Sequence, residues 1–270
     1  MTVLTALTLI LAEFAMMPPD NEPTARQYEP ASVSIAVDGA TRNYPYQLLR
    51  PVGADGPTPL VVFLHGAGER GNDNQAQLTY LPKQFLKANH LRDRPCHVLA
   101  MQCPKREQWA PYQTRVSTPR PPLPAMQAVI AAIKKVIAEE DIDHARVYLT
   151  GLSMGGYGSW DLAARHPDWF AAVVPICGGG QVTNAKQLTD VPIWAFHGED
   201  DRVVPESESR RMVEAIRAAG GTPAYTNLPG VDHGSWHFAY GPRGAMEWMF
   251  AQRNPDPAAL KAATEPSKPN

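Results

Sequence analysis

The chain has 270 residues, 44% of them apolar, and its 25 Lys and Arg against 27 Asp and Glu give a formal net charge of −2. This length suits one α/β domain or two small ones, and either can bury a full core. The small net charge gives no electrostatic reason to expect nucleic acid or an anionic membrane as a partner, so a small or neutral ligand fits better.

The N-terminus carries an apolar run from Val3 to Ala12, which is too short to span a bilayer. The run has the length of the apolar region of a signal peptide, but no Lys or Arg precedes Arg26. A degenerate export signal and an N-terminal arm both remain open. We favour export over a cytoplasmic location, expect no membrane insertion, and exclude residues 1–30 from the predicted fold.

Apolar runs of strand length alternate with longer helical patterns, which predicts a mostly parallel sheet with helices on both faces. We predict eight strands, at residues 32–37, 44–50, 59–65, 97–102, 146–151, 171–177, 191–198 and 223–230. The predicted helices cover residues 123–140, 155–166, 207–220 and 244–252. The first two strands flank a turn composition, "DGATRN", so we expect an antiparallel hairpin at one edge. One domain should cover residues 31–253, followed by a polar, disordered tail over residues 254–270.

The three cysteines form neither a disulfide framework nor a metal-ligand spacing. Cys96 and Cys103 bracket a predicted strand, so their Cα atoms should lie about 23 Å apart at about 3.3 Å per residue. A disulfide cannot bridge that distance. We expect Cys96, Cys103 and Cys177 to be free thiols, which favours a reducing compartment without excluding export.

The segment "TGLSMGGYGS", residues 150–159, places four glycines around one serine directly after an apolar strand pattern. A serine on a very sharp strand-to-helix turn needs neighbours without side chains, and Gly151 and Gly155 stand two residues before and two after Ser153. The G-x-S-x-G pattern is weak evidence by itself. It predicts Ser153 as a nucleophile if an acid and a base follow in the chain.

Both follow, each in a loop after a predicted strand. "HGEDDRVVP" offers Glu199, Asp200 and Asp201, and "GVDHGSWHF" offers His233 and His237. Elbows of this kind are followed in chain order by an acid and then a histidine, which orients and activates the serine. The carboxyl ends of parallel strands share one edge of a sheet, where open α/β folds bind ligands.

The motifs "LHGAGERG", "TGLSMGGYGSWDLA", "PICGGG", "FHGEDDRVVP" and "GVDHGSWHFAY" together resemble the phospholipase/carboxylesterase family of α/β-hydrolases, including bacterial esterases similar to feruloyl esterases and polyhydroxybutyrate depolymerases. The resemblance runs from about residue 44 to residue 251. It implies an α/β-hydrolase fold, selects Asp201 as the acid and His233 as the base, and implies no metal or organic cofactor.

An oxyanion hole needs two backbone N–H groups. One should come from Met154, which follows the nucleophile at a helix N-terminus. The family resemblance places the second at Ala67, just after "HG". We also weigh Trp109 as an aromatic wall for the substrate against simple packing of its loop. His197, which precedes a glycine at a strand end, is expected to be structural, as is His65.

Three functions remain in competition. The leading one is a serine esterase that acts through an acyl-enzyme on short-chain, aromatic or polymer-borne esters. The second is a serine peptidase of the prolyl oligopeptidase type, although no propeller repeats precede the predicted catalytic segment. The third is a catalytically inactive fold used as a binding module, which would gain nothing from a complete triad. The oligomeric state is not predicted.

Overall fold

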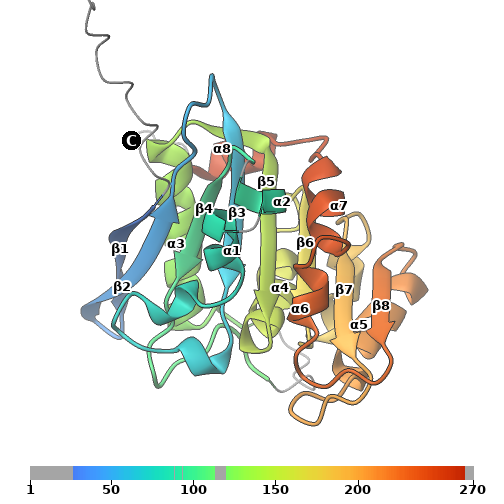
Figure 1. Ribbon diagram of the computed structural model, residues 1–270. Helices are drawn as coiled ribbons and strands as arrows, with labels where there is room; N and C mark the ends of the chain where they lie inside the picture. Colours follow the sequence, from blue (N-terminus) through green and yellow to red (C-terminus); the bar gives the residue numbers. More distant parts are fainter. Residues whose placement is uncertain (1–26, 88, 93, 113–119, 265–270) are drawn as a thin grey trace, which may run out of the picture.

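One sheet of eight strands organises the chain (Figure 1). The computed structural model describes residues 27–264 except 88, 93 and 113–119. The strands are β1 (Tyr28–Val37), β2 (Ala40–Leu49), β3 (Thr58–Leu64), β4 (His97–Met101), β5 (Ile142–Leu152), β6 (Ala172–Ile176), β7 (Trp194–Gly198) and β8 (Ala224–Leu228). Their order across the sheet is β1-β2-β4-β3-β5-β6-β7-β8. All eight predicted strands are present.

The first two strands form the predicted antiparallel hairpin at one edge of the sheet. Its two-residue turn consists of Asp38 and Gly39, both with positive φ (50° and 77°), a backbone that matches the twist of hairpin strands. The hairpin strand begins at Tyr28, three residues before the predicted start of the domain at residue 31. The apolar run near the N-terminus lies outside the described residues.

The remaining strands, β3 to β8, are mutually parallel, and β2 joins them antiparallel through β4. Strand β3 is buried along its whole length. Leu60, Val62 and Leu64 face the core on one side of the sheet, and Val61 and Phe63 face the core on the other side. A central strand covered on both faces has to be apolar throughout. This explains the uninterrupted run "PLVVFL" in the sequence.

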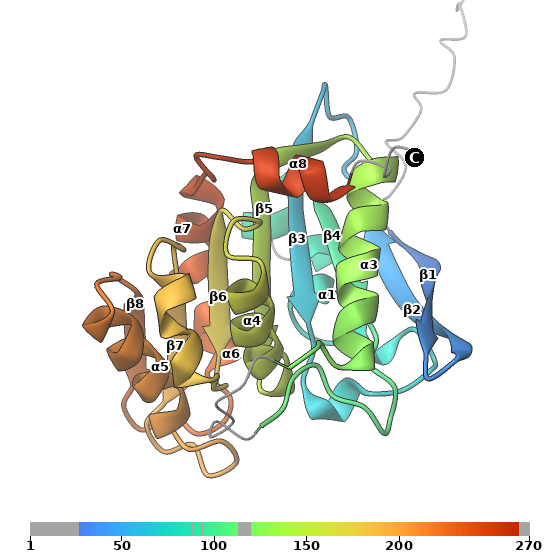
Figure 2. The same cartoon turned by 180° about the vertical axis from the view of Figure 1, so that it is seen from behind.

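Helices cover both faces of the sheet (Figures 1 and 2). One face carries α3 (Pro124–Glu139), α4 (Met154–Arg165), α5 (Ser207–Ala218) and α8 (Ala258–Thr264). The other carries α1 (Leu81–Lys87), α2 (Asn89–Arg92), α6 (Trp236–Ala239) and α7 (Ala245–Ala251). Short 3-10 turns are η1 (Ala67–Glu69), η2 (Ala76–Leu78) and η3 (Val182–Leu188). The four predicted helices correspond to α3, α4, α5 and α7.

Two expectations for the chain need correction. The tail predicted to be disordered from residue 254 contains α8, which packs against α3 and buries Leu260 completely. Leu260 belongs to the same core cluster as the buried face of α3, and its burial stabilises the docked helix. The short helices α1, α2 and α6 were not predicted either, since helices of four to seven residues give too little periodic pattern.

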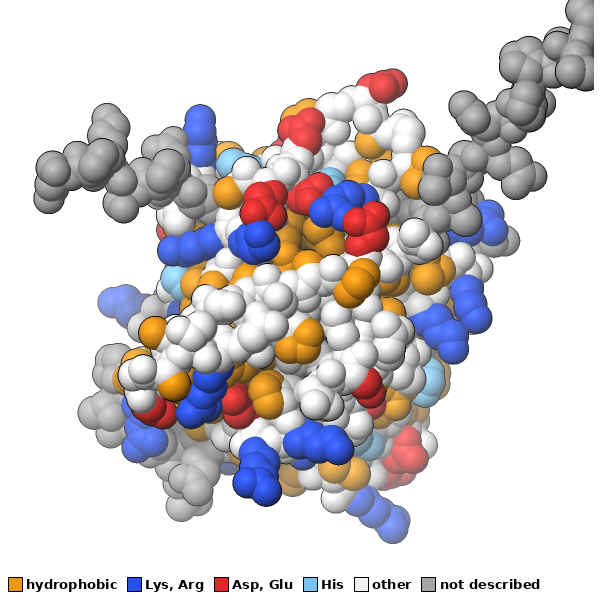
Figure 3. Space-filling model, turned by 90° about the vertical axis from the view of Figure 1, so that its left-hand side faces the viewer, with side chains coloured by type: hydrophobic (Ala, Val, Ile, Leu, Met, Phe, Trp, Pro, Cys, Tyr) orange, Lys and Arg blue, Asp and Glu red, His pale blue; other side chains and the backbone are white. Residues whose placement is uncertain are grey.

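The surface has no large field of one sign on the side where the hairpin lies. Figure 3 shows basic and acidic side chains interspersed there, with hydrophobic side chains between them. This distribution agrees with the small net charge. Among the described helices, none combines the length and the apolarity that a membrane crossing requires.

Candidate active site

Ser153 stands at the sharp turn between β5 and α4. Its backbone has φ 55° and ψ −116°, a conformation that non-glycine residues seldom adopt and that is held only by surrounding structure. The turn is so tight that a Cβ on Gly151 would overlap the carbonyl of Gly155, and a Cβ on Gly155 would overlap the carbonyl of Leu64. Two glycines at these positions are therefore a steric requirement of the elbow.

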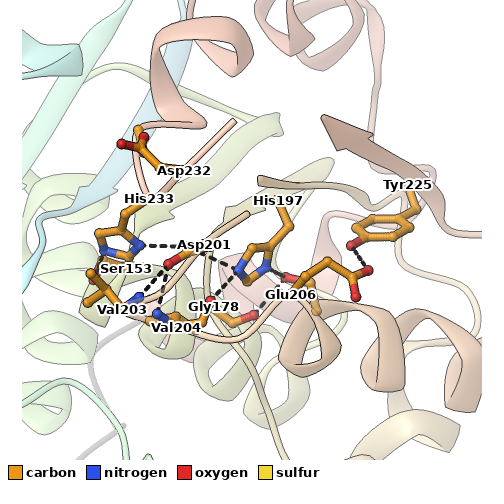
Figure 4. Close-up of polar contacts among 12 residues, drawn as sticks. Ser153, Gly178, His197, Asp201, Val203, Val204, Glu206, Tyr225, Asp232 and His233 are labelled. Carbon is orange, nitrogen blue, oxygen red and sulfur yellow. Dashed lines mark hydrogen bonds and ion pairs between the residues drawn. The ribbon is translucent and has the colours of Figure 1, made fainter. Parts of the chain in front are cut away.

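The structure brings the three predicted triad residues into one chain of hydrogen bonds (Figure 4). The imidazole of His233 lies between the other two, with Nε2 at 2.9 Å from Ser153 Oγ and Nδ1 at 2.6 Å from Asp201 Oδ2. The three residues follow β5, β7 and β8, all at the carboxyl edge of the sheet. This is the order and the spacing in which an acid orients a base and the base takes the serine proton.

The Asp201 carboxylate is held by its own loop. Its Oδ1 accepts hydrogen bonds from the backbone N–H groups of Val203 (2.8 Å) and Val204 (2.9 Å). Its Oδ2 lies 2.6 Å from His233 Nδ1 and 3.3 Å from His197 Nε2. The competing candidates Glu199 and Asp200 are both exposed, unlike Asp201. The geometry thus separates Asp201 from its two acidic neighbours.

Two other histidines are buried beneath the loops. His65 has Nδ1 at 2.6 Å from the Gly66 carbonyl, and its Nε2 accepts the N–H of Cys103 at 2.9 Å. His197 has Nε2 at 2.9 Å from the Val204 carbonyl. Burial lowers the pKa of both, to about 4 for His65. Both are therefore neutral loop-holding groups, as predicted.

The predicted oxyanion donors lie on two neighbouring backbones. Met154 begins α4, and Ala67 begins η1 directly after Gly66. A Cβ on Gly66 would come within 2.9 Å of a Leu152 side-chain carbon, so the η1 loop rests on the end of β5 beside the elbow. Among the described residues, no hydrogen bond uses either the Met154 or the Ala67 N–H. Both N–H groups are therefore available to an anion.

Arg70 holds the η1 loop through two backbone carbonyls. It donates from Nε to the Ala67 carbonyl (3.0 Å) and from Nη1 to the Glu107 carbonyl (3.3 Å). These bonds fix the Ala67 peptide directly, because the guanidinium reaches both carbonyls at once. Glu69 is half-buried, and burial raises the pKa of its carboxyl.

Trp109 does not line the site. Its side chain is completely buried, its Nε1–H donates to the His65 carbonyl at 3.0 Å, and its ring meets the His65 ring edge-on at 5.1 Å. The prediction of a substrate-facing wall is wrong, and the packing alternative describes this residue. The exposed aromatic of that loop is Tyr112, which contacts Tyr157 on α4 with ring centroids 5.1 Å apart.

A buried thiol lies beside the triad, a contact that the sequence did not predict. The ligand-type atoms of Cys177, Asp201 and His233 all lie within 4.8 Å of one another, the one such group found among the described residues. Burial raises the pKa of the Cys177 thiol to about 12, so it stays protonated at neutral pH. A thiol is a poor metal ligand in that state. The sequence could have indicated this contact, because Cys177 follows β6 at the same edge of the sheet as Ser153.

Residues 52–239 match the phospholipase/carboxylesterase family. This matched segment contains the elbow, the η1 loop and all three triad residues. The chain belongs to this family. The α/β-hydrolase fold expected from the sequence is confirmed by the sheet described above and by the family match.

Several solved structures and curated proteins are similar to parts of the chain. The crystal structure of a thermostable esterase has 40% sequence identity and a TM-score of 0.74, over 83% of this chain and 63% of the other. A poly(3-hydroxyalkanoate) depolymerase C of Paucimonas lemoignei is 42% identical over 57 residues, 20% of this chain and 14% of its own. A bifunctional acetylxylan esterase/xylanase of Neocallimastix patriciarum is 35% identical over 78 residues, 29% and 12% of the two chains. The chain spans less than half the length of the curated relatives it matches.

Proposed function

We propose that this protein is a serine esterase that cleaves carboxylic esters through an acyl-enzyme. The observation that carries the proposal is the position of His233, whose two ring nitrogens lie 2.9 Å from Ser153 Oγ and 2.6 Å from Asp201 Oδ2. A histidine that only held its loop in place would not require a serine on a strained backbone turn beside its second ring nitrogen. The family match and the similar thermostable esterase support the same reaction class.

The reaction follows from this arrangement. His233 takes the proton of Ser153 as Oγ attacks the ester carbonyl, and Asp201 stabilises the imidazolium that forms. The N–H groups of Ala67 and Met154 stabilise the oxyanion of the tetrahedral intermediate. His233 then gives its proton to the leaving alcohol, and the same base activates a water molecule that hydrolyses the acyl-enzyme.

The surroundings of the triad support small or polymer-borne esters as substrates. Beside His233 lies an open hollow of about 610 Å³, lined mainly by polar and small residues of the two loops that carry the acid and the base. Tyr112 offers an exposed aromatic surface next to the nucleophile helix. The names of the two curated relatives also describe enzymes of polymeric esters, one a polyester and one an acetylated polysaccharide.

A fluorophosphonate probe tests the proposal. Mass spectrometry should find the label on Ser153, and Ser153→Ala should lose both the label and at least about a thousandfold of the activity on p-nitrophenyl acetate, as triad nucleophiles do. Ser34→Ala, in the distant hairpin, is the matched control and should keep both. Equal labelling of the Ser153→Ala variant would refute the role of Ser153. Cleavage of peptide p-nitroanilides in preference to esters would favour the peptidase alternative.

A further inference from the structure

A surface groove runs along α1, outside the triad. It consists of two shallow hollows of about 320 and 330 Å³ that share Thr79, Lys83 and Lys87. The first is completed by Tyr80, Gln84, Trp236 and His237, and the second by Tyr28, Gln75, Leu78 and Leu86. We call these lining residues the α1 groove. Helices α1 and α6, which contribute to it, lie on the same face of the sheet (Figure 1).

The groove is basic. Lys83 and Lys87 are exposed and stand four residues apart on α1, so their ammonium groups share one face of the helix. Neither lysine takes part in an ion pair with any residue that the structure describes, and no Asp or Glu lines either hollow. Like charges at this spacing slightly destabilise a helix, a cost that an anionic ligand would remove.

The other lining residues suit a sugar chain. Tyr80 and Trp236 contact each other with ring centroids 5.2 Å apart, and aromatic rings present broad apolar faces with a polar edge. Thr79, Gln75 and Gln84 add neutral hydroxyl and amide groups that can donate and accept hydrogen bonds. Both hollows are open to solvent, which suits an extended chain better than a small enclosed ligand.

One residue of the α1 groove contacts the triad. Trp236, which lines it, also meets the His233 ring edge-on with centroids 5.4 Å apart. Trp236 belongs to α6, which begins three residues after His233. A chain that occupies the groove therefore contacts a residue that itself packs against the ring of His233.

We propose that the α1 groove binds an acidic polysaccharide, a sugar chain that carries carboxylates, and thereby presents an ester of that chain to Ser153. The proposal rests on the proposed esterase function and names its substrate class. Lys83 and Lys87 pair with carboxylates of the chain, and the aromatic residues contact its sugar rings. Because these contacts lie beside the triad and not in it, they select the polymer without changing the chemistry.

The experiment compares three acetate esters: acetylated polygalacturonate, acetylated neutral xylan and p-nitrophenyl acetate. We expect the double variant Lys83→Gln/Lys87→Gln to lower kcat/KM on acetylated polygalacturonate about five- to tenfold, the effect of two exposed ion pairs, and to leave the other two esters unchanged. High salt should lower wild-type activity on the acidic polymer alone, because it screens exposed charges. Lys186→Gln, on η3, is the matched control and should behave as wild type on all three esters.

Binding is measured separately from catalysis. The Ser153→Ala protein should bind unesterified polygalacturonate in calorimetry, and the added lysine substitutions should weaken that binding by a similar factor. Equal loss on the acidic and the neutral polymer, or no loss on either, would overturn the proposal. So would hydrolysis of p-nitrophenyl acetate with no binding of polygalacturonate. Failure of p-nitrophenyl acetate hydrolysis itself would instead count against the proposed esterase function, while the binding measurement would still test the groove.

Discussion

His233 and His197 both approach the Asp201 carboxylate, yet only His233 also reaches Ser153, the proposed nucleophile. His233 has Nδ1 at 2.6 Å from Asp201 Oδ2, and His197 has Nε2 at 3.3 Å from the same oxygen. The far nitrogen of His233 faces Ser153 Oγ at 2.9 Å, whereas the far nitrogen of His197 faces Ser209 Oγ at 2.7 Å in the interior. The two imidazoles therefore differ in what lies beyond them.

Solvent access separates the two histidines further. His197 is completely buried, and burial lowers its pKa. His233 is partly exposed and lines an open hollow of about 610 Å³. A carboxylate contact is thus insufficient to identify a catalytic base: an accessible nucleophile at the opposite nitrogen is also required. Substitutions at these residues and their neighbours should separate the two roles.

Asp201→Asn should lower kcat on p-nitrophenyl acetate by about 10⁴, because an amide cannot hold His233 in the tautomer that accepts the serine proton. Asp200→Asn and Glu199→Gln should each change kcat by less than about threefold, since both side chains are exposed. Steady-state kinetics of the three variants measure the contrast. A severe loss of kcat in Asp200→Asn together with a mild loss in Asp201→Asn would show that Asp201 is not the acid of the triad.

The pH profile should identify His233 as the base. Activity on p-nitrophenyl acetate should fall toward acid pH, up to about tenfold per pH unit, because a protonated imidazole cannot accept the serine proton. The dependence should vanish from the residual activity of His233→Ala and persist in His237→Ala. Profiles of kcat/KM for the three proteins give the answer. A wild-type profile that is flat from about pH 5 to pH 9 would argue against this base.

His197→Gln should affect stability more than chemistry. It replaces a buried ring that contacts Val204 and Ser209, and an imperfectly satisfied buried group costs about 1–3 kcal/mol. For a domain of this size that lowers Tm by roughly 2–4 °C per kcal/mol. Calorimetry and kinetics at a temperature well below Tm measure the two effects. A loss of activity as large as that of His233→Ala, without a change in Tm, would erase the distinction between the two histidines.

His65 should make the fold less stable in acid. Its pKa is lowered from 6.5 to about 4, so the unfolded state binds the proton more readily, and the stabilisation present above pH 6.5 is lost as pH falls toward 4. Between pH 7 and pH 5 the loss should be roughly 2 kcal/mol in the free energy of unfolding. Urea titrations should show this slope reduced in His65→Gln and unchanged in His237→Gln. An identical slope in His65→Gln would place the acid sensitivity elsewhere.

Much of the fold could be predicted from the sequence because the sheet is periodic and its loops carry strong local chemistry. The run in β3 is apolar on both faces, and the Asp38-Gly39 turn specifies a hairpin. The elbow around Ser153 was also predictable, since only glycine fits where two backbones touch. These features depend on residues close together in the chain.

Other features depend on which distant segments meet. The sequence left Trp109 open between a substrate-facing wall and packing of its loop, and the structure buries its ring against His65. Helix α8 packs against α3, more than 100 residues away in the chain, and Leu260 is buried there. The α1 groove combines α1 with α6 and Tyr28, which the sequence separates widely.

The order of the elements, the strained turn at Ser153, and an acid and a histidine at the carboxyl edge of the sheet all follow from the amino-acid sequence. Several acids and histidines remained as alternatives there, and only the family resemblance chose among them. Which groups contact each other became clear only in the folded chain: Asp201 with His233, Arg70 with the Ala67 carbonyl, and Cys177 beside the triad. Backbone sterics and periodicity act over a few residues, whereas burial and hydrogen-bond partners depend on segments that only folding brings together.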